Sequence, residues 1–138
     1  MFATSPEPVA LGVKALARAH RRSMDAEVLE ILDPASVGVP AGVLAELLYG
    51  KYNNPDRAAK LDVLIADMRA SYPVLPFDAG AADWFGRLKH RLKATMIQDR
   101  DLLIASTALA HGYALVTHNT KHFQRIDELV LLDWTVPI

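Results

Sequence analysis

The sequence has no cysteine, so disulfide bonds and thiolate metal sites are excluded. Its net charge is only -1 over 138 residues, and any contact with nucleic acid must therefore come from local basic patches. No apolar run approaches the roughly 20 residues that a membrane-spanning helix requires. The N-terminus lacks a basic leader followed by an apolar stretch, which predicts a cytoplasmic protein without a signal peptide.

What the sequence does contain is typical of a folded globular protein, with 51% hydrophobic and 22% charged residues. From Val39 onward, helical and extended patterns alternate. Helices are predicted for residues 40–52, 55–70 and 78–93, and from Asp99 or Asp101 to a closing Gly112. Asp78 is the expected N-cap of the third helix. Strands are predicted for 113–117 and 130–132, with at most a short one within 72–77 because of its two prolines.

This alternation predicts an α/β layer structure around a parallel sheet. Binding sites in such sheets form beyond the carboxyl ends of the strands. The segment from Thr117 to Asn119 follows the strand predicted for 113–117, so we expect it at the mouth of a site.

Two acidic residues interrupt apolar patterns. Glu46 stands beside Leu47 and Leu48 in a largely apolar helix, and Asp101 opens the run LLIA. A partly buried carboxylate needs a cation, a hydrogen-bond donor or a metal ion as a partner. The residues alone leave simpler interpretations open, with Glu46 pointing to solvent and Asp101 acting as an N-cap.

Four segments in unbroken order resemble the VapC-type PIN domain. They are AGVLAELLYGKYN (41–53), VLPFDAGAADWFGRLKHRL (74–92), DRDLLIASTALAHGYALVTHNTKHF (99–123) and LVLLDW (129–134). The resemblance implies a PIN domain over residues 34–138, with the three-layer fold of that family, in which helices flank a parallel sheet.

The same resemblance implies a metal-dependent endoribonuclease that acts as a toxin in a toxin–antitoxin system. Its cofactor would be Mg²⁺ or Mn²⁺, which activates water for attack on a phosphodiester. Glu46 and Asp101 match metal-binding acids of the family, Asp99 is expected to support them in catalysis, and Thr117 and Asn119 are expected to position the substrate. Thr117 and Asn119 also fit plain turn residues. The implied partners are an RNA substrate, an antitoxin of the VapB or FitA type and a second copy of the chain.

The sequence departs from the family in two places. The usual first strand, which ends in the motif LLDTN, is not found, so we expect this strand to be missing or replaced. Glu7 lies at a suitable spacing but between Pro6 and Pro8, which are unsuited to a central strand. The acid expected before Phe123 is His122 instead. Fewer carboxylates weaken a divalent-ion site, so a weakened or inactive enzyme is an open alternative.

Residues 8–33 resemble a ribbon-helix-helix antitoxin of the FitA or VapB kind, chiefly through RRSMDAEVLEIL (21–32). In that family a short strand pairs with its twin and enters the DNA major groove. Two interpretations remain open for residues 1–33: an antitoxin segment joined to the PIN domain, which we favour, or the first helices of a divergent PIN domain. The first allows a second function, a non-catalytic fusion remnant that dimerises and binds DNA or a partner protein.

Overall fold

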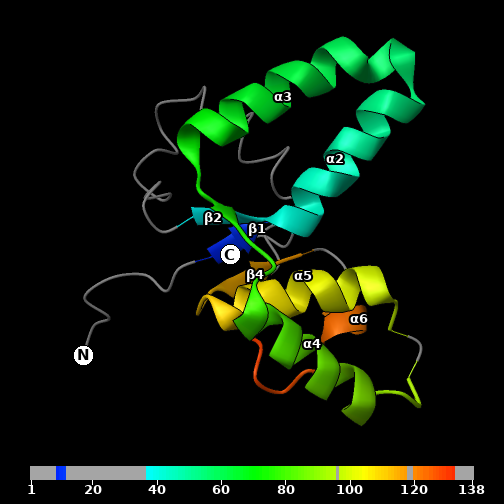
Figure 1. Cartoon of the computed structure of the whole chain (residues 1–138), viewed down its shortest axis with the longest axis vertical. Coiled ribbons are helices and arrows are strands. Elements are labelled where there is room, and N and C mark those ends of the chain that lie inside the picture. The colour runs from blue at the N-terminus through cyan, green and yellow to red at the C-terminus, as the bar shows by residue number, and fades with distance from the viewer. Residues whose placement is uncertain (1–8, 12–36, 96, 118–119, 133–138) are drawn as a thin grey trace.

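The computed structural model describes residues 9–11, 37–95, 97–117 and 120–132. Their five strands form one sheet in the order β3-β2-β1-β4-β5, and every neighbouring pair is parallel. The α/β class with a parallel sheet is therefore confirmed. The strands are β1 (Val9–Leu11), β2 (Val37–Pro40), β3 (Val74–Leu75), β4 (Ala114–Val116) and β5 (Leu131–Leu132) (Figure 1).

Strand β1 lies in the centre of the sheet. It pairs with β2 through Val9 and Val37, and with β4 through Leu11 and Val116. We expected the first strand of the family to be missing or replaced, and the structure shows the second alternative, with VAL in its place. Both edges of β1 are occupied, so this strand is not available to pair with a twin as in a ribbon-helix-helix dimer. The antitoxin interpretation of residues 8–33 is not supported, and residues 12–36 lie outside the described part.

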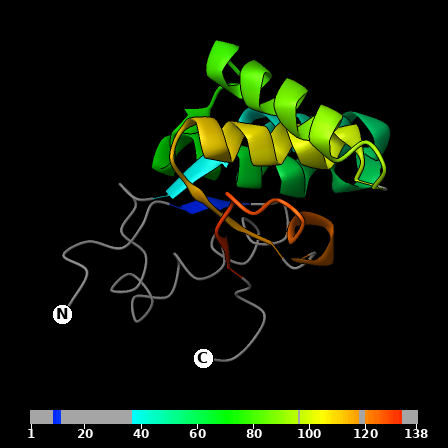
Figure 2. The same ribbon diagram turned by 90° about the horizontal axis from the view of Figure 1, so that it is seen from below.

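The main helices lie on one side of the sheet (Figure 2). A helical hairpin extends away from β2, while a second pair of helices packs together in front of the strands (Figure 1). The hairpin consists of α2 (Ala41–Asn53) and α3 (Ala58–Ser71), joined by a 3-10 turn (Pro55–Arg57), and the second pair of α4 (Ala79–Arg91) and α5 (Asp99–Ala110). The short α6 (Thr120–Phe123) lies below them in Figure 2. Helices on the other face of the sheet, which would form the third layer, stay a prediction.

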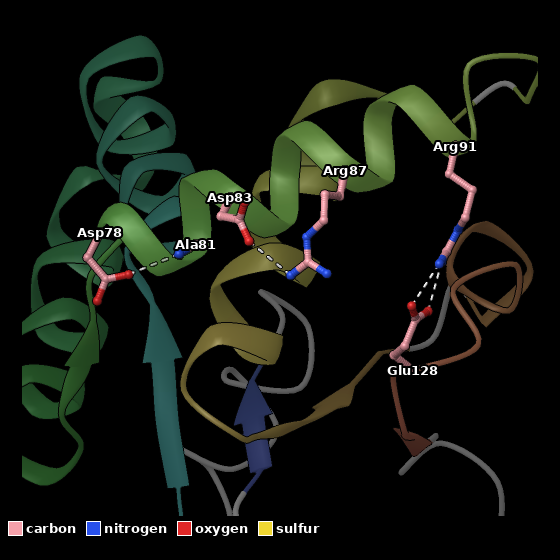
Figure 3. Close-up of polar contacts among 6 residues, drawn as sticks. All are labelled: Asp78, Ala81, Asp83, Arg87, Arg91 and Glu128. Carbon is pink, nitrogen blue, oxygen red and sulfur yellow. Dashed lines mark hydrogen bonds and ion pairs between the residues drawn. The ribbon is translucent and has the colours of Figure 1, made fainter.

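Two helix ends follow the chemistry that the sequence indicates. The Oδ1 atom of Asp78 accepts a hydrogen bond from the backbone N–H of Ala81 at 3.0 Å, which confirms Asp78 as the N-cap of α4 (Figure 3). Gly112 follows α5 with φ +74°, a left-handed conformation that glycine adopts without steric penalty. The turn at Gly112 reverses the chain, so that β4 runs back along α5.

The core forms between the sheet and the helices that cover it. Most of its buried side chains come from the three central strands and from α2 to α5, and they include Ala10, Val37, Val39, Val43, Leu47, Met68, Leu88, Leu102, Ala105, Leu115 and Val116. Within the ranges that the structure describes, no helix is both long enough and apolar enough to cross a membrane.

Candidate metal centre

The order of the strands defines one place for a site. From β1 the chain first builds β2 and β3 on one side, and later β4 and β5 on the other. The connections that leave β1 and β4 at their carboxyl ends therefore diverge, and such a switch point is where open parallel sheets bind ligands. Helix α2 begins directly after the carboxyl end of β2, and the first turn of α5 lies at the same edge because α5 runs opposite to β4.

Glu46 lies in the second turn of α2, and its side chain is 30% exposed. Partial burial raises the pKa of its carboxyl group above the ordinary value. The positive charge of Arg100 lowers this pKa, and the negative charge of Asp101 raises it. The Nε atom of Arg100, the residue before Asp101, lies 3.1 Å from Oε1 of Glu46, so the fold brings Glu46 beside the first turn of α5 although the two acids are far apart in the sequence. Glu46 does not simply point to solvent.

Asp101 lies in the first turn of α5, and its side chain is only 14% exposed. The N-cap of α5 is Gln98, so Asp101 is a helical residue and not the cap. Its Oδ2 atom accepts a hydrogen bond from Nδ1 of His122 at 3.2 Å. His122 is the residue that stands where the family resemblance leads us to expect an acid.

The other predicted site residues differ in how the structure places them. Oδ2 of Asp99 pairs with Nζ of Lys89 on α4 at 3.0 Å, and the Asp99 side chain is 62% exposed. Thr117 directly follows β4, is half-buried, and donates its backbone N–H to the carbonyl of Leu132 at 2.9 Å. Asn119 lies outside the described residues. The roles of these three residues stay predictions.

Two basic residues at the centre were not predicted as partners of the acids. Nε of Arg100 lies 3.1 Å from Oε1 of Glu46, and His122 contacts Asp101 as described. Both contacts join residues on different elements. The sequence carried one signal, the replacement of an expected acid by His122, and gave no indication for Arg100.

The donor set at this edge fits a hydrated divalent ion. Glu46 and Asp101 supply carboxylate oxygens, which hard cations prefer, and their mutual repulsion would be relieved by a cation between them. Mg²⁺ is commonly held by one or two carboxylates together with water and substrate phosphates. Among the described residues, no group of three or more His, Asp or Glu side chains is placed to hold an ion. The site therefore suits an ion that keeps several water ligands.

Comparison with known proteins identifies the family of the chain. The sequence pattern described as the PIN domain matches residues 13–129. Ribonuclease VapC2 of Rickettsia felis is 35% identical over 104 residues, which cover 72% of this chain and 75% of that protein. The tRNA(fMet)-specific endonuclease VapC of Shigella flexneri is 30% identical over 108 residues, or 75% of this chain and 80% of that protein.

A solved structure supports the same assignment. In VapBC2 from Rickettsia felis bound to a DNA fragment from its promoter, one chain matches with a TM-score of 0.74 and 28% identity, covering 91% of this chain and 98% of that one. The family match begins at residue 13, inside the predicted N-terminal unit 1–33, and the division between residues 33 and 34 stays a prediction. The match over most of the chain, together with relatives at 30% identity or more, shows that this chain belongs to the PIN domain family and, within it, to the VapC type.

Proposed function

We propose that the chain is an endoribonuclease of the VapC toxin type, which cleaves RNA with Mg²⁺ or Mn²⁺ held by Glu46 and Asp101. The observation that carries this proposal is the pair of partly buried carboxylates from α2 and α5 at the carboxyl edge of the sheet, where Glu46 contacts Arg100, the residue before Asp101, at 3.1 Å. Arg100 and His122 each contact one of these two acids, whereas a divalent ion would neutralise both carboxylates at once.

The residues around the pair suit phosphodiester hydrolysis. A bound divalent ion polarises a phosphoryl oxygen and lowers the pKa of water. Glu46 and Asp101 would bind this ion at the edge of the sheet. The first turn of α5 would place the positive end of its helix dipole near a substrate phosphate. Thr117, at the carboxyl end of β4, and Asn119 would orient the substrate or the attacking water. Asp99, two residues before Asp101, would support catalysis from its ion pair with Lys89.

The relatives suggest the substrate class and the partner. The Shigella flexneri relative is named as a tRNA(fMet)-specific endonuclease, so structured RNA is the proposed substrate class. The Rickettsia felis structure contains a toxin–antitoxin complex on promoter DNA. We therefore infer an antitoxin of the VapB or FitA type as the partner that restrains cleavage, a homodimer of this chain, and DNA binding by the complex with the antitoxin.

RNA cleavage by matched variants tests the proposal. The purified chain is incubated with tRNA and Mg²⁺, beside Glu46→Gln, Asp101→Asn and the exposed control Asp83→Asn. Loss of one of two metal-binding charges should reduce cleavage by about a hundredfold or more, while Asp83→Asn cuts like the wild type. Equal cleavage by all four proteins, or no cleavage by any of them, would contradict the proposal that the chain is a ribonuclease.

A non-catalytic role is the second candidate. It is favoured by one observation, that the described residues provide only two carboxylates at the centre and His122 in place of a third. In this case the chain would be a non-catalytic PIN domain that dimerises and binds DNA or a partner protein. A mobility shift on the DNA upstream of its own gene tests this candidate, with an unrelated duplex as the control.

A further inference from the structure

The side chain of Arg100 lies directly beside the candidate metal centre. Its Nε atom is 3.1 Å from Oε1 of Glu46, so the contact joins the first turn of α5 to the second turn of α2. These two helices also pack against each other. Arg100 therefore contacts the carboxylate that we propose to bind a divalent ion.

The two partners of this ion pair differ in exposure. The Arg100 side chain is 63% exposed, whereas that of Glu46 is 30% exposed. A guanidinium group has five N–H donors, and the contact with Glu46 is made through the Nε atom. Much of the group therefore remains accessible to a second ligand. The planar fork of arginine matches the oxygens of a phosphate group.

Arg100 and a divalent ion would compete for the same carboxylate. The charge of Arg100 favours ionised Glu46, and that of Asp101 opposes it. In the metal-free protein, Arg100 therefore provides the countercharge for Glu46. A cation bound between Glu46 and Asp101 would take over this countercharge and would repel the guanidinium at such short range.

We propose that Arg100 is an RNA-binding residue, paired with Glu46 in the metal-free protein and released to a substrate phosphate when a divalent ion binds Glu46. This inference rests on the proposed function, because it requires an ion at Glu46 and Asp101. It adds a substrate contact from the residue between Asp99 and Asp101. It also links ion binding to RNA binding, since the ion frees the group that binds the phosphate.

Two binding measurements on Arg100→Gln test this proposal. Mn²⁺ binding is measured by titration calorimetry without RNA, and binding of fluorescently labelled tRNA by anisotropy with Ca²⁺ in place of Mg²⁺. Arg87→Gln is the matched control, because Arg87 is also an exposed arginine paired with one acid, Asp83, at 3.0 Å. Arg100→Gln should bind Mn²⁺ about three- to tenfold more tightly and RNA about three- to tenfold more weakly than the wild type. Arg87→Gln should match the wild type in both.

Tighter Mn²⁺ binding together with weaker RNA binding would identify Arg100 as a residue that contacts the RNA and competes with the ion. A residue that merely supports the fold would weaken both ligands together, and that result overturns the inference, as does unchanged binding of either ligand. Normal Mn²⁺ binding and RNA cleavage by the wild type, with no effect of Arg100→Gln, contradict the inference alone. A wild-type chain that binds no Mn²⁺ contradicts the proposed function and this inference with it.

Discussion

The imidazole of His122 and the carboxylate of Asp101 are joined by a 3.2 Å hydrogen bond beside the candidate metal centre. A carboxylate at position 122 would add a third negative charge next to Asp101. We expect His122→Asp to bind Mg²⁺ or Mn²⁺ about five- to tenfold more tightly than the wild type, because the affinity of such sites follows the number of charged ligands. Titration calorimetry checks this expectation.

The control for this substitution is His122→Asn, which removes the imidazole without adding charge. It should leave ion binding within about twofold of the wild type, because a surface hydrogen bond contributes little. Equal ion affinities of the aspartate and asparagine variants would show that position 122 does not face the bound ion.

Glu46 should limit the stability of the metal-free protein. Partial burial raises the pKa of its carboxyl group, so the ionised form is less favourable in the folded chain than in the unfolded chain. In buffer that contains a metal chelator at pH 7, Glu46→Gln should raise the melting temperature by about 1–3 °C. The neutral amide avoids the cost of removing a charged carboxylate from water. The expected sign is stabilisation together with loss of cleavage. A lower melting temperature would mean that the ion pair with Arg100 outweighs the effect of burial.

Glu128 should make the fold sensitive to acid. Both of its carboxylate oxygens accept hydrogen bonds from Arg91 at 2.7 Å, which join the last turn of α4 to the segment before β5 (Figure 3). These bonds lower the pKa of Glu128 from 4.5 to about 2. A depressed pKa contributes stability above pH 4.5, and this contribution is lost as the pH falls toward 2.

The measurement compares wild type and Glu128→Gln by thermal melting across this range. At pH 6 the variant should melt about 1–2 °C lower, a small difference because the pair is exposed, and the difference should narrow as the pH falls to 3. Asp83→Asn, which removes the single contact with Arg87, should melt like the wild type at every pH. A difference that does not change with pH would contradict the assigned cause.

Substitution of Gly38 tests the packing of β2 against its neighbours, and Gly86 on α4 provides a contrasting glycine. A Cβ atom at Gly38 would lie 2.9 Å from side-chain atoms of Leu75 and Tyr113, whereas a Cβ at Gly86 on α4 would meet nothing within 4 Å. Gly38→Ala should lower the free energy of unfolding by about 1–3 kcal/mol through overpacking. Gly86→Ala should raise it by about 0.5–1 kcal/mol, because alanine is the better helix former. Urea denaturation measures both, and a stabilising Gly38→Ala would contradict the sheet arrangement.

The long helices and the parallel sheet could be predicted from the sequence because local signals coincide with the tertiary structure. Asp78 caps α4, and Gly112 ends the turn after α5, as their residue types indicate. Strand β2 was not predicted, because VGVP is short and contains a glycine and a proline. It is stabilised by long-range pairing, including the bond from the Val39 N–H to the Pro73 carbonyl at 2.9 Å. The four-residue α6 was not predicted from the sequence either.

The candidate site could likewise be predicted only in part from the sequence. Glu46 and Asp101 could be selected from the sequence because each interrupts an apolar pattern, and the family resemblance assigned them one role. The fold brings their helices together, since α2 and α5 pack against each other at the same edge of the sheet. The ion pair of Arg100 with Glu46 could not be predicted, because an exposed arginine beside two acids has no distinctive spacing and its partner lies on another helix.

Crystals soaked in Mn²⁺ give the most direct test of the central claim, that Glu46 and Asp101 bind one divalent ion. Anomalous scattering should show a manganese peak within coordination distance of both carboxylates, and the peak should be absent from Glu46→Gln crystals treated in the same way. A peak that contacts neither residue, or no peak at an ion concentration that supports RNA cleavage, would contradict the account.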